Sequence, residues 1–286
     1  MRAIIDADWH IYAAGFKAEE EPESHACQTL KQMLNKAINT LGVEDYSVYI
    51  GGGGNFREDV AVTQGYKENR KDLRKPKHFA VLREYLTEVW NAEVVNGMET
   101  DDFVSIQLYE DFLEHEGDPE QCTIILVSVD KDLNNTPGWH YNPQKDRKYF
   151  VTEDTAMKHF WYQMLMGDRT DNIPGLPDVT PWIRHKYGLT ARKGFGQASA
   201  RKVMATCTTA VEAEHAAVDC YIAYGIESGW TSDEVYNYLQ EQGKLLWMVR
   251  ELQWDEPVLF DYDRSTFDER FEQHPLWEYQ KSYDSP

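Results

Sequence analysis

The sequence contains few cysteines and no long apolar run. Its four cysteines, Cys27, Cys122, Cys207 and Cys220, show no CxxC spacing, which favours reduced thiols in a cytosolic compartment. No run of 18 apolar residues occurs, so neither a membrane-spanning helix nor a membrane partner is expected. The apolar stretch at the N-terminus is too short for a secretory signal and predicts a first β-strand instead.

Acidic residues outnumber basic ones, and the basic ones are unevenly distributed. The net charge of −20 argues against nucleic-acid binding by the chain as a whole. Between Val179 and Val211, however, there is no Asp or Glu and there are six basic residues. Six more lie between Lys67 and Lys77, so the two stretches hold 12 of the 29 Lys and Arg residues. This segregation indicates local anion-binding surfaces on an acidic body, although a merely solvated surface explains each stretch equally well.

Strand-like and helix-like spacings of apolar residues alternate as far as Met166. Strands are expected at 3–5, 46–50, 92–95 and 123–129, with shorter pieces near 139–141 and 149–151. Helices are expected between them, at 24–41 with Ser24 as cap, at 79–89, from 100 to about 114, and after Thr152. This order predicts an α/β fold with a mostly parallel central sheet flanked by helices.

Beyond Asp168 the strand pattern fades. Helices are expected at 197–205, 210–224 and 232–250. The remaining tail is acidic and aromatic, and it is expected to pack through Trp254, Phe260, Phe271 and Trp277.

The stretch from Gly167 to Gly175 contains Asp168 and Asp171, three residues apart, between an apolar helix and a Pro/Gly break. At a helix end this spacing places both carboxylates on one side. Taken alone, the pair is better explained as a cap or turn than as half of a cation site.

Further carboxylates follow the predicted strands and change this balance. The acids form four groups along the chain: Asp6; then Glu99, Asp101 and Asp102; then Asp130 and Asp132; then Asp168 and Asp171. A helix cap at Thr100 explains Asp101 and Asp102 but not Glu99. Three groups follow apolar strands, so a parallel sheet would bring them to one edge.

Converging carboxylates repel one another unless cations join them. Oxygen ligands suit Mg²⁺ or Mn²⁺, and the nine histidines show no HxxxH or HxH pair that would indicate zinc. Two such ions, roughly 3.5–4 Å apart, clamp the attacking and leaving oxygens of a phosphate. The basic stretches supply a surface for that phosphate.

With these features, the chain resembles the flap endonuclease/5′–3′ exonuclease family, which includes phage 5′ nucleases and the N-terminal 5′ nuclease domain of bacterial DNA polymerase I. The motifs follow the family order over roughly residues 1–210: Ile5-Asp6, Asn55-Phe56-Arg57, Tyr66-Lys67-x-x-Arg70, Glu99-x-Asp101-Asp102, Asp130-Lys131-Asp132-Leu133, and Gly167-Asp168-x-x-Asp171-Asn172-Ile173-Pro174-Gly175. Gly194-Phe195-Gly196 and the helix after it are similar to the family's helix–three-turn–helix, which holds duplex DNA by its backbone.

The resemblance implies an architecture. It implies a PIN-like α/β nuclease core at residues 1–167 with a basic, arch-like segment at 65–78. A helical DNA-binding subdomain at 168–250 and a packed acidic tail at 251–286 would follow. A K⁺ ion at the helix–three-turn–helix is a further expectation.

The resemblance also implies roles for single residues. Asp6, Glu99 and Asp101 would hold the first metal ion, with Asp130 near both ions. Asp132, Asp168 and Asp171 would hold the second ion or its waters, while Asp102 is either an outer acid or only a helix cap. Lys67 and Arg70 would contact the scissile phosphate, and Tyr66 would stack on a terminal base. The expected DNA contacts are Tyr66, Arg57, Arg192, Lys193, Gly194, Gly196, Gln197, Ser199, Arg201 and Lys202.

Two departures from the family pattern stand out. The family carries a further aspartate just after the second strand, where this chain has Gly51–Gly54. Either the first metal ion binds more weakly or Asp8 compensates. In addition, residues 178–193 form an insertion whose basic side chains either extend the DNA contact or form a solvated loop.

The expected function is a Mg²⁺-dependent, structure-selective 5′ nuclease that cuts DNA duplexes at a 5′ end or flap. It is expected to act as a monomer in the cytoplasm of a bacterium or a phage-infected host. Two alternatives stay open. One is a related ribonuclease acting on RNA/DNA hybrids, and the other is a non-catalytic DNA-binding homologue.

Overall fold

The computed structural model of the chain describes residues 1–191 and 194–277. It divides into two compact units, which are described one at a time. Unit 1 comprises residues 1–56, 72–153 and 248–258, and unit 2 comprises residues 57–71, 154–247 and the residues from 259 onward. The predicted domain boundaries differ from these units. Residues 248–258 belong to unit 1, and residues 57–71 belong to unit 2.

Unit 1 is built on a six-stranded sheet in the order β3-β2-β1-β4-β5-β6. Its strands are β1 (Arg2–Asp6), β2 (Asp45–Gly53), β3 (Glu93–Asn96), β4 (Ile124–Val127), β5 (Gly138–Asn142) and β6 (Arg147–Val151). All neighbouring strands run parallel except β5 and β6, which are antiparallel. The predicted mostly parallel sheet is therefore confirmed.

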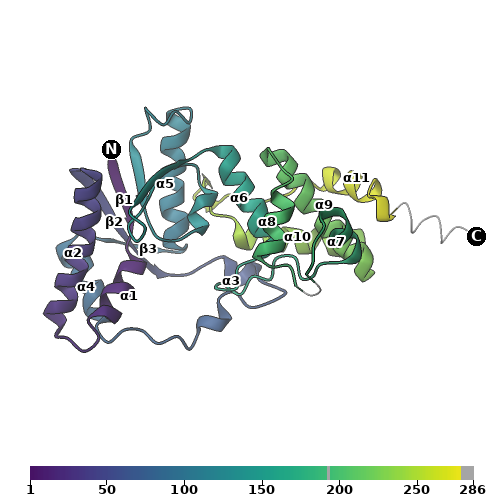
Figure 1. Cartoon of the computed structure of the whole chain (residues 1–286). Helices are drawn as coiled ribbons and strands as arrows, with labels where there is room; N and C mark the ends of the chain where they lie inside the picture. Colours follow the sequence, from purple (N-terminus) through teal and green to yellow (C-terminus); the bar gives the residue numbers. More distant parts are fainter. Residues whose placement is uncertain (192–193, 278–286) are drawn as a thin grey trace, which may run out of the picture. The chain divides into compact units, whose positions relative to one another are not determined.

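Helices cover both sides of this sheet (Figure 1). Ile5 faces α1 (Asp8–Lys17), α2 (Glu23–Leu41) and α4 (Phe79–Val89), where Leu30, Leu34 and Leu82 are fully buried. Ile4 faces the opposite way, toward α5 (Thr100–Glu114). Because successive side chains of a strand point to opposite faces, the short apolar β1 supplies both cores at once.

Smaller elements complete unit 1. The 3₁₀ turn η2 (Asp132–Asn135) follows β4, and a hairpin of β7 (Leu252–Gln253) and β8 (Glu256–Pro257) lies near the C-terminus. Trp254 occupies the turn of that hairpin and is 90% exposed. The prediction that Trp254 packs into the body is wrong, because the tight turn with positive φ at Trp254 and Asp255 directs it into solvent.

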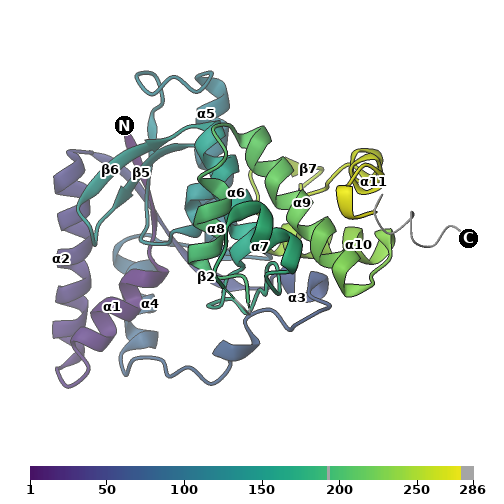
Figure 2. The same cartoon turned by 45° about the vertical axis from the view of Figure 1, so that its right-hand side comes forward.

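Unit 2 is helical (Figure 2). Its elements are α3 (Arg57–Val60), η1 (Glu68–Arg70), α6 (Glu153–Met166), α7 (Pro181–Tyr187), α8 (Gln197–Met204), α9 (Ala210–Ser228), α10 (Ser232–Leu246) and α11 (Arg264–Glu272). Phe160, Trp161 and Tyr221 form its core together with Phe260 and Phe271, two of the tail aromatics predicted to pack. Helices α9 and α10 each begin with a capping box, at Thr209 and at Thr231, which fixes where they start.

The structure corrects three local predictions. Helix α1 was not expected, and Asp8 is its first residue. The cap of α2 is Pro22 rather than Ser24, and the cap of α5 is Glu99 rather than Thr100. In neither case does a side chain make the capping hydrogen bond, so the cap preferences of Ser and Thr were a misleading guide here. Within the described residues, no helix has the length and apolar character that crossing a membrane requires.

Candidate active site

The first part of the candidate site lies in unit 1, at the carboxyl edge of its sheet. Strands β2 and β3 extend to one side of β1, and β4, β5 and β6 extend to the other. The chain therefore reverses its direction of winding between β1 and β4, and open α/β sheets bind ligands at such a switch point. Asp6 ends β1 here, and Ser128 and Asp130 follow β4.

Asp6 is only 6% exposed and lies in a polar pocket made by its neighbours. Its Oδ2 accepts a hydrogen bond from the Ser128 hydroxyl at 3.0 Å, and its Oδ1 accepts one from the Asp8 amide at 3.1 Å. Burial raises the pKa of Asp6 to about 7, and the charges of Asp8 and Asp130 add to the effect. Asp6 is thus a carboxylate whose negative charge is disfavoured by its surroundings. Ser128 was missed by sequence reasoning, because no motif marks it.

Asp8 lies beside the place where the family aspartate is absent. Its carboxylate accepts hydrogen bonds from the Gly51 amide at 3.0 and 3.2 Å and from the Thr100 hydroxyl at 3.1 Å. A Cβ atom at Gly51 would be 3.0 Å from Asp8 Oδ2, so the Asp8 carboxylate fills the space next to Gly51. The Cβ of Gly52 would point elsewhere, 2.1 Å from Asn96 Oδ1 and 2.7 Å from the Val95 carbonyl oxygen.

The acids at the start of α5 fall into different environments. Glu99 and Asp101 are half-buried at the first turn, next to Thr100 and its bond to Asp8. Asp102 is fully buried, and its Oδ1 accepts a hydrogen bond from the Val249 amide at 3.0 Å. Of the two roles considered for Asp102, this contact supports a structural one, since it fastens the 248–258 segment within unit 1.

The acids after β4 are arranged by a short turn. Asp130 Oδ1 accepts a hydrogen bond from the Asp132 amide at 2.8 Å, and the Asp130 amide donates to the Ser128 hydroxyl at 3.1 Å. Asp130 is exposed, whereas Asp132 is half-buried with its carboxylate 3.2 Å from Lys131 Nζ. Ser128 therefore connects Asp6 and Asp130, the two acids on either side of the switch point.

In unit 2, the stretch from Gly167 to Gly175 forms a closed loop. Asp168 and Ile173 exchange two backbone hydrogen bonds, of 2.9 and 2.7 Å. Gly167 and Gly175 both have positive φ, and a Cβ atom on either would lie within 2.3 Å of the other side of the loop, so only glycine fits both positions. Asp168 is 4% exposed, and its Oδ1 accepts from the Thr170 amide at 2.6 Å. The turn role expected of an isolated Asp is therefore present.

Asp171, in the same loop, gathers the three residues predicted to touch the substrate. Its carboxylate lies 2.6 Å from Arg70 Nη2 and 3.5 Å from Lys67 Nζ, and it accepts a hydrogen bond from the Tyr66 hydroxyl at 3.1 Å. The Asp171 backbone carbonyl also accepts from the Lys67 amide at 2.9 Å. Lys67 itself has a positive φ of 51°. The structure thus brings Tyr66, Lys67, Arg70 and Asp171 together within unit 2.

The predicted duplex-binding stretch is also in unit 2. Gly194 and Gln197 are exposed at the N-terminus of α8, where Gly196 is the cap residue, and Arg201 and Lys202 are exposed in its last turn. Ser199 is only 7% exposed, so its hydroxyl is not presented at the surface as predicted. Arg192 and Lys193 lie outside the described residues.

Arg57 corrects the DNA-binding prediction most clearly. It is fully buried, and its guanidinium donates to the carbonyl oxygens of Leu245 at 3.0 Å and Trp247 at 2.6 Å. These carbonyls belong to the C-terminal end of α10, where helix carbonyls need partners and positive charge is favourable. Arg57 therefore fastens α3 to α10 and does not present its guanidinium to a ligand.

The predicted metal ligands divide between the units. Asp6, Glu99, Asp101, Asp102, Asp130 and Asp132 belong to unit 1, and Asp168 and Asp171 belong to unit 2. Among residues 1–191 and 194–277, no three His, Cys, Asp or Glu side chains form a group with the geometry of a metal site. The complete ligand set stays a prediction.

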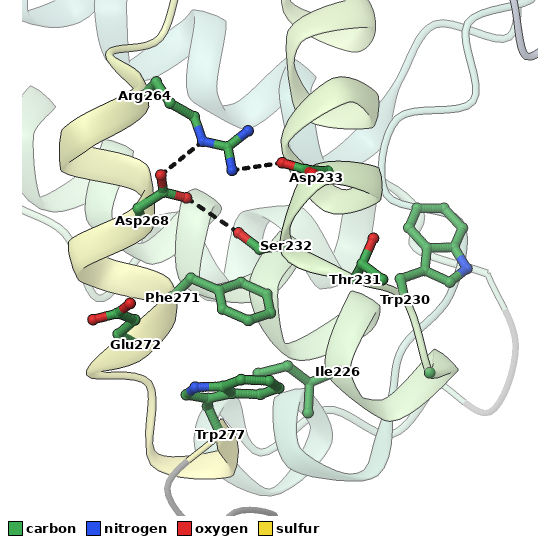
Figure 3. A pocket seen from close by; sticks show the side chains of 11 residues that line it. Ile226, Trp230, Thr231, Ser232, Asp233, Arg264, Asp268, Phe271, Glu272 and Trp277 are labelled. Atoms are coloured by element: carbon green, nitrogen blue, oxygen red, sulfur yellow. Dashed lines mark hydrogen bonds and ion pairs between the residues drawn. The ribbon is translucent and has the colours of Figure 1, made fainter.

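A separate pocket of about 640 Å³ lies in unit 2, among α9, α10 and α11 (Figure 3). Phe271, Trp277 and Ile226 form its apolar side, and Arg264 lies at its rim between Asp233 and Asp268. The Arg264 guanidinium is 2.6 Å from Asp233 Oδ1 and 2.8 Å from Asp268 Oδ2. None of the predicted site residues lines this pocket.

Comparison with known proteins finds relatives by sequence, although no protein-family model matches. The chain is 27% identical over 200 residues to a 5′–3′ exonuclease of Buchnera aphidicola subsp. Schizaphis graminum, covering 62% of this chain and 65% of that protein. It is 27% identical over 177 residues to DNA polymerase I of Rhizobium leguminosarum, covering 54% of this chain and 16% of that protein. The chain thus spans less than two thirds of the length of either relative.

Solved structures show a more distant likeness. One is the flap endonuclease of bacteriophage T5 in a pseudo-enzyme-product complex with DNA and metal ions. It is 13% identical with a TM-score of 0.47, and the match covers 86% of this chain and 99% of that one. Another is the catalytic core of Rad2 with a DNA substrate, 12% identical with a TM-score of 0.46, covering 99% of this chain and 90% of that one.

Proposed function

We propose that the chain belongs to the 5′ nuclease family and is a divalent-metal-dependent 5′ nuclease acting on DNA. The proposed substrates are duplexes with a free 5′ end or a 5′ flap. The observation that carries the proposal is the set of acids at the switch point of the unit 1 sheet, where Asp6 and Asp130 are joined through Ser128. The 27% identity to a 5′–3′ exonuclease supports the same conclusion.

The residues of unit 1 suit a hard divalent cation. Burial raises the pKa of the Asp6 carboxyl to about 7, and a bound cation would stabilise its charged form. Its neighbours Asp8 and Asp130 offer oxygen atoms, the ligand type that Mg²⁺ and Mn²⁺ prefer. Asp6, Glu99, Asp101 and Asp130 are proposed to hold the first ion. Asp132, Asp168 and Asp171 are proposed to hold the second ion or its waters.

When bound, such ions supply positive charge to the phosphate and activate water for in-line attack. The chain's own residues supply the rest of the chemistry. Lys67 and Arg70 are proposed to bind the scissile phosphate and to stabilise the charge that develops on it. Tyr66 does not offer its ring for the predicted stacking on a terminal base, because it is only 8% exposed and packs in the core of unit 2. In the absence of DNA the Asp171 carboxylate pairs with both side chains, at 2.6 Å from Arg70 Nη2 and 3.5 Å from Lys67 Nζ.

DNA binding is proposed to involve the N-terminus of α8. The Gly194 amide already donates to Asp178 Oδ1 at 2.7 Å, so the proposed phosphate contacts come from exposed Gln197 at the start of α8 and from Arg201 and Lys202 in its last turn. Affinity should therefore fall steeply with salt and depend little on sequence. A K⁺ ion near this turn, a monomeric state and a cytoplasmic location belong to the same proposal.

The assignment is tested by combining Asp130→Asn with Asp168→Asn and measuring cleavage of a 5′-labelled flap duplex in Mg²⁺. Cleavage should be abolished while duplex affinity stays within about threefold, because the phosphate contacts are made elsewhere. The matched control combines Glu58→Gln with Glu110→Gln, two exposed carboxylates, one from each unit. Full activity of the Asp130/Asp168 variant would contradict the assignment.

Substrate choice is measured with matched DNA, RNA and RNA/DNA hybrid duplexes of one sequence. The proposal expects DNA to be cleaved fastest. Faster cleavage of the hybrid would favour the ribonuclease alternative. Tight duplex binding with no cleavage of any substrate would favour a non-catalytic homologue.

A further inference from the structure

The segment of residues 62–71, which contains Tyr66, Lys67 and Arg70, is fastened at its beginning by a residue that no motif marks. Glu241, on α10, accepts hydrogen bonds through Oε1 from the Val62 amide at 2.7 Å and the Thr63 amide at 2.6 Å. Its Oε2 accepts a third from the Thr63 hydroxyl at 2.5 Å. One carboxylate thus satisfies both backbone amides at the start of the segment.

The rest of the segment is held by the loop that contains Asp171. Asn172 Nδ2 donates to the Gly65 carbonyl oxygen at 2.9 Å, and Arg70 Nε donates to the Thr170 carbonyl oxygen at 2.7 Å. Asn69 Nδ2 donates to the Arg169 carbonyl oxygen at 2.8 Å. Apart from the short η1, the segment has no helix or strand of its own, so its position depends on these contacts and on Tyr66, which is buried in the core of unit 2.

Helix α10 holds that loop as well as the segment. The Tyr238 hydroxyl donates to the Gly175 carbonyl oxygen at 2.7 Å, and Gln242 Oε1 accepts from the Gly175 amide at 3.0 Å. Glu241 stands between these two residues in sequence. Tyr238, Glu241 and Gln242 of α10 therefore hold both the 62–71 segment and the loop that contains Asp171.

We propose that Glu241 is a positioning residue, which sets the place of Tyr66, Lys67 and Arg70 against Asp171 by holding the start of the 62–71 segment. The proposal rests on the proposed nuclease function for its kinetic consequence, but not for its structural one. Val60 and Ala61 pack against the core just before the segment, whereas Val62 is 86% exposed, so Glu241 holds the segment where its apolar contacts end.

Two substitutions separate the hydrogen bonds from the charge. Glu241→Ala removes all three acceptor contacts. Glu241→Gln keeps one oxygen for the two amides and an NH₂ group that can donate to the Thr63 hydroxyl oxygen, so the geometry is retained without the charge. Glu58→Ala, an exposed acid on α3 of the same unit, is the matched control.

The structural readout is amide hydrogen exchange in full-length protein without DNA. In Glu241→Ala, exchange at Val62 and Thr63 should quicken by about tenfold, and trypsin should cut after Lys67 and Arg70 faster, since lost hydrogen bonds raise local opening. Glu241→Gln should remain within about threefold of the wild type, and the control should not change. Unaltered exchange and proteolysis in Glu241→Ala would overturn the proposal, whether or not the protein is a nuclease.

The kinetic readout is single-turnover cleavage of the flap duplex at saturating protein, together with duplex affinity and thermal midpoint. Glu241→Ala should slow cleavage by about tenfold with affinity within about twofold and the midpoint little changed, and Glu241→Gln should restore most of the rate. Faster exchange with an unchanged rate would overturn the positioning role. A wild-type protein that cuts no DNA would refute the proposed function, while the exchange result would still decide whether Glu241 fastens the segment.

Discussion

Asp6 and Asp171 are both largely withdrawn from solvent, yet their surroundings are opposite. Asp6, in unit 1, has hydroxyl and amide donors around it but acids as its nearest charges, and its pKa is raised to about 7. Asp171, in unit 2, lies against Arg70 and Lys67. A metal ion would therefore stabilise the charged form of Asp6. Asp171, in contrast, is already paired with the side chains of Arg70 and Lys67.

This difference refines the predicted ligand set. A carboxylate paired with a guanidinium and an ammonium gives up part of that pairing when it turns to a metal ion. Asp171 is therefore suited to orient Lys67 and Arg70 before the substrate arrives, and Asp6 is suited to bind the metal ion first. Replacing the two residues one at a time should separate these roles.

Asp6→Asn should have the largest effect. An Asn side chain can keep the bonds to Asp8 and Ser128 but carries no charge, so cleavage should fall by on the order of 10³-fold. The thermal midpoint in EDTA should stay the same or rise, because a disfavoured charge is removed. Cleavage near the wild-type rate, or a large drop in the midpoint without metal, would show that Asp6 is not a ligand of a cation site.

Gly51→Asp and Gly52→Asp compare two adjacent places for the absent family aspartate. Gly52→Asp should lower the free energy of unfolding by about 3 kcal/mol, because its Cβ meets Asn96 and the Val95 backbone. Gly51→Asp should cost less and should raise Mn²⁺ affinity, measured by calorimetry, because it adds a carboxylate beside Asp8. Equal stability of the two variants would contradict the assigned strand geometry.

Asp171→Asn should have an intermediate effect, and it should lower the stability in EDTA, where Asp6→Asn leaves it unchanged or raises it. The loss of the ion pairs to Arg70 and Lys67 should lower the free energy of unfolding of the helical unit by about 2 kcal/mol, as measured by urea denaturation in EDTA. Arg169→Ala, in the same loop, is the control for exposed charge. A gain in stability on Asp171→Asn would remove the distinction between the two carboxylates.

The sequence predicted the sheet well because short apolar runs stand between stretches of helical spacing, and it predicted which acids follow which strands. It did not predict the contact of Asp8 with Gly51. That contact depends on the parallel register of β1 and β2 and on helix α1, which begins directly after β1 with no turn signal. The structural role of Arg57 also could not be predicted. Its guanidinium donates to carbonyl oxygens at the end of α10, 188 and 190 residues further along the chain, and no local sequence pattern indicates such distant partners.

The smallest expected effect concerns His140, a buried histidine of unit 1. Burial lowers its pKa, whereas burial raises the pKa of Asp6. His140 donates from Nε2 to the Thr136 carbonyl oxygen at 2.9 Å, and burial lowers its pKa to about 4. The unfolded chain binds a proton near pH 6.5, so stability should fall as the pH drops from 6.5 toward 4, by about 1–2 kcal/mol at pH 5. His140→Gln should show a shallower loss in urea denaturation at pH 7.5 and 5.0 in EDTA. An equal slope in both proteins would contradict a neutral His140.

The most direct test of the central claim is to incubate the purified protein with a 5′-labelled flap duplex in Mg²⁺ and, separately, in EDTA. The account predicts release of short 5′-labelled products in Mg²⁺, none in EDTA, and none from the Asp6→Asn protein in either condition. Cleavage that persists in EDTA, or an intact duplex in Mg²⁺ and in Mn²⁺, would contradict it.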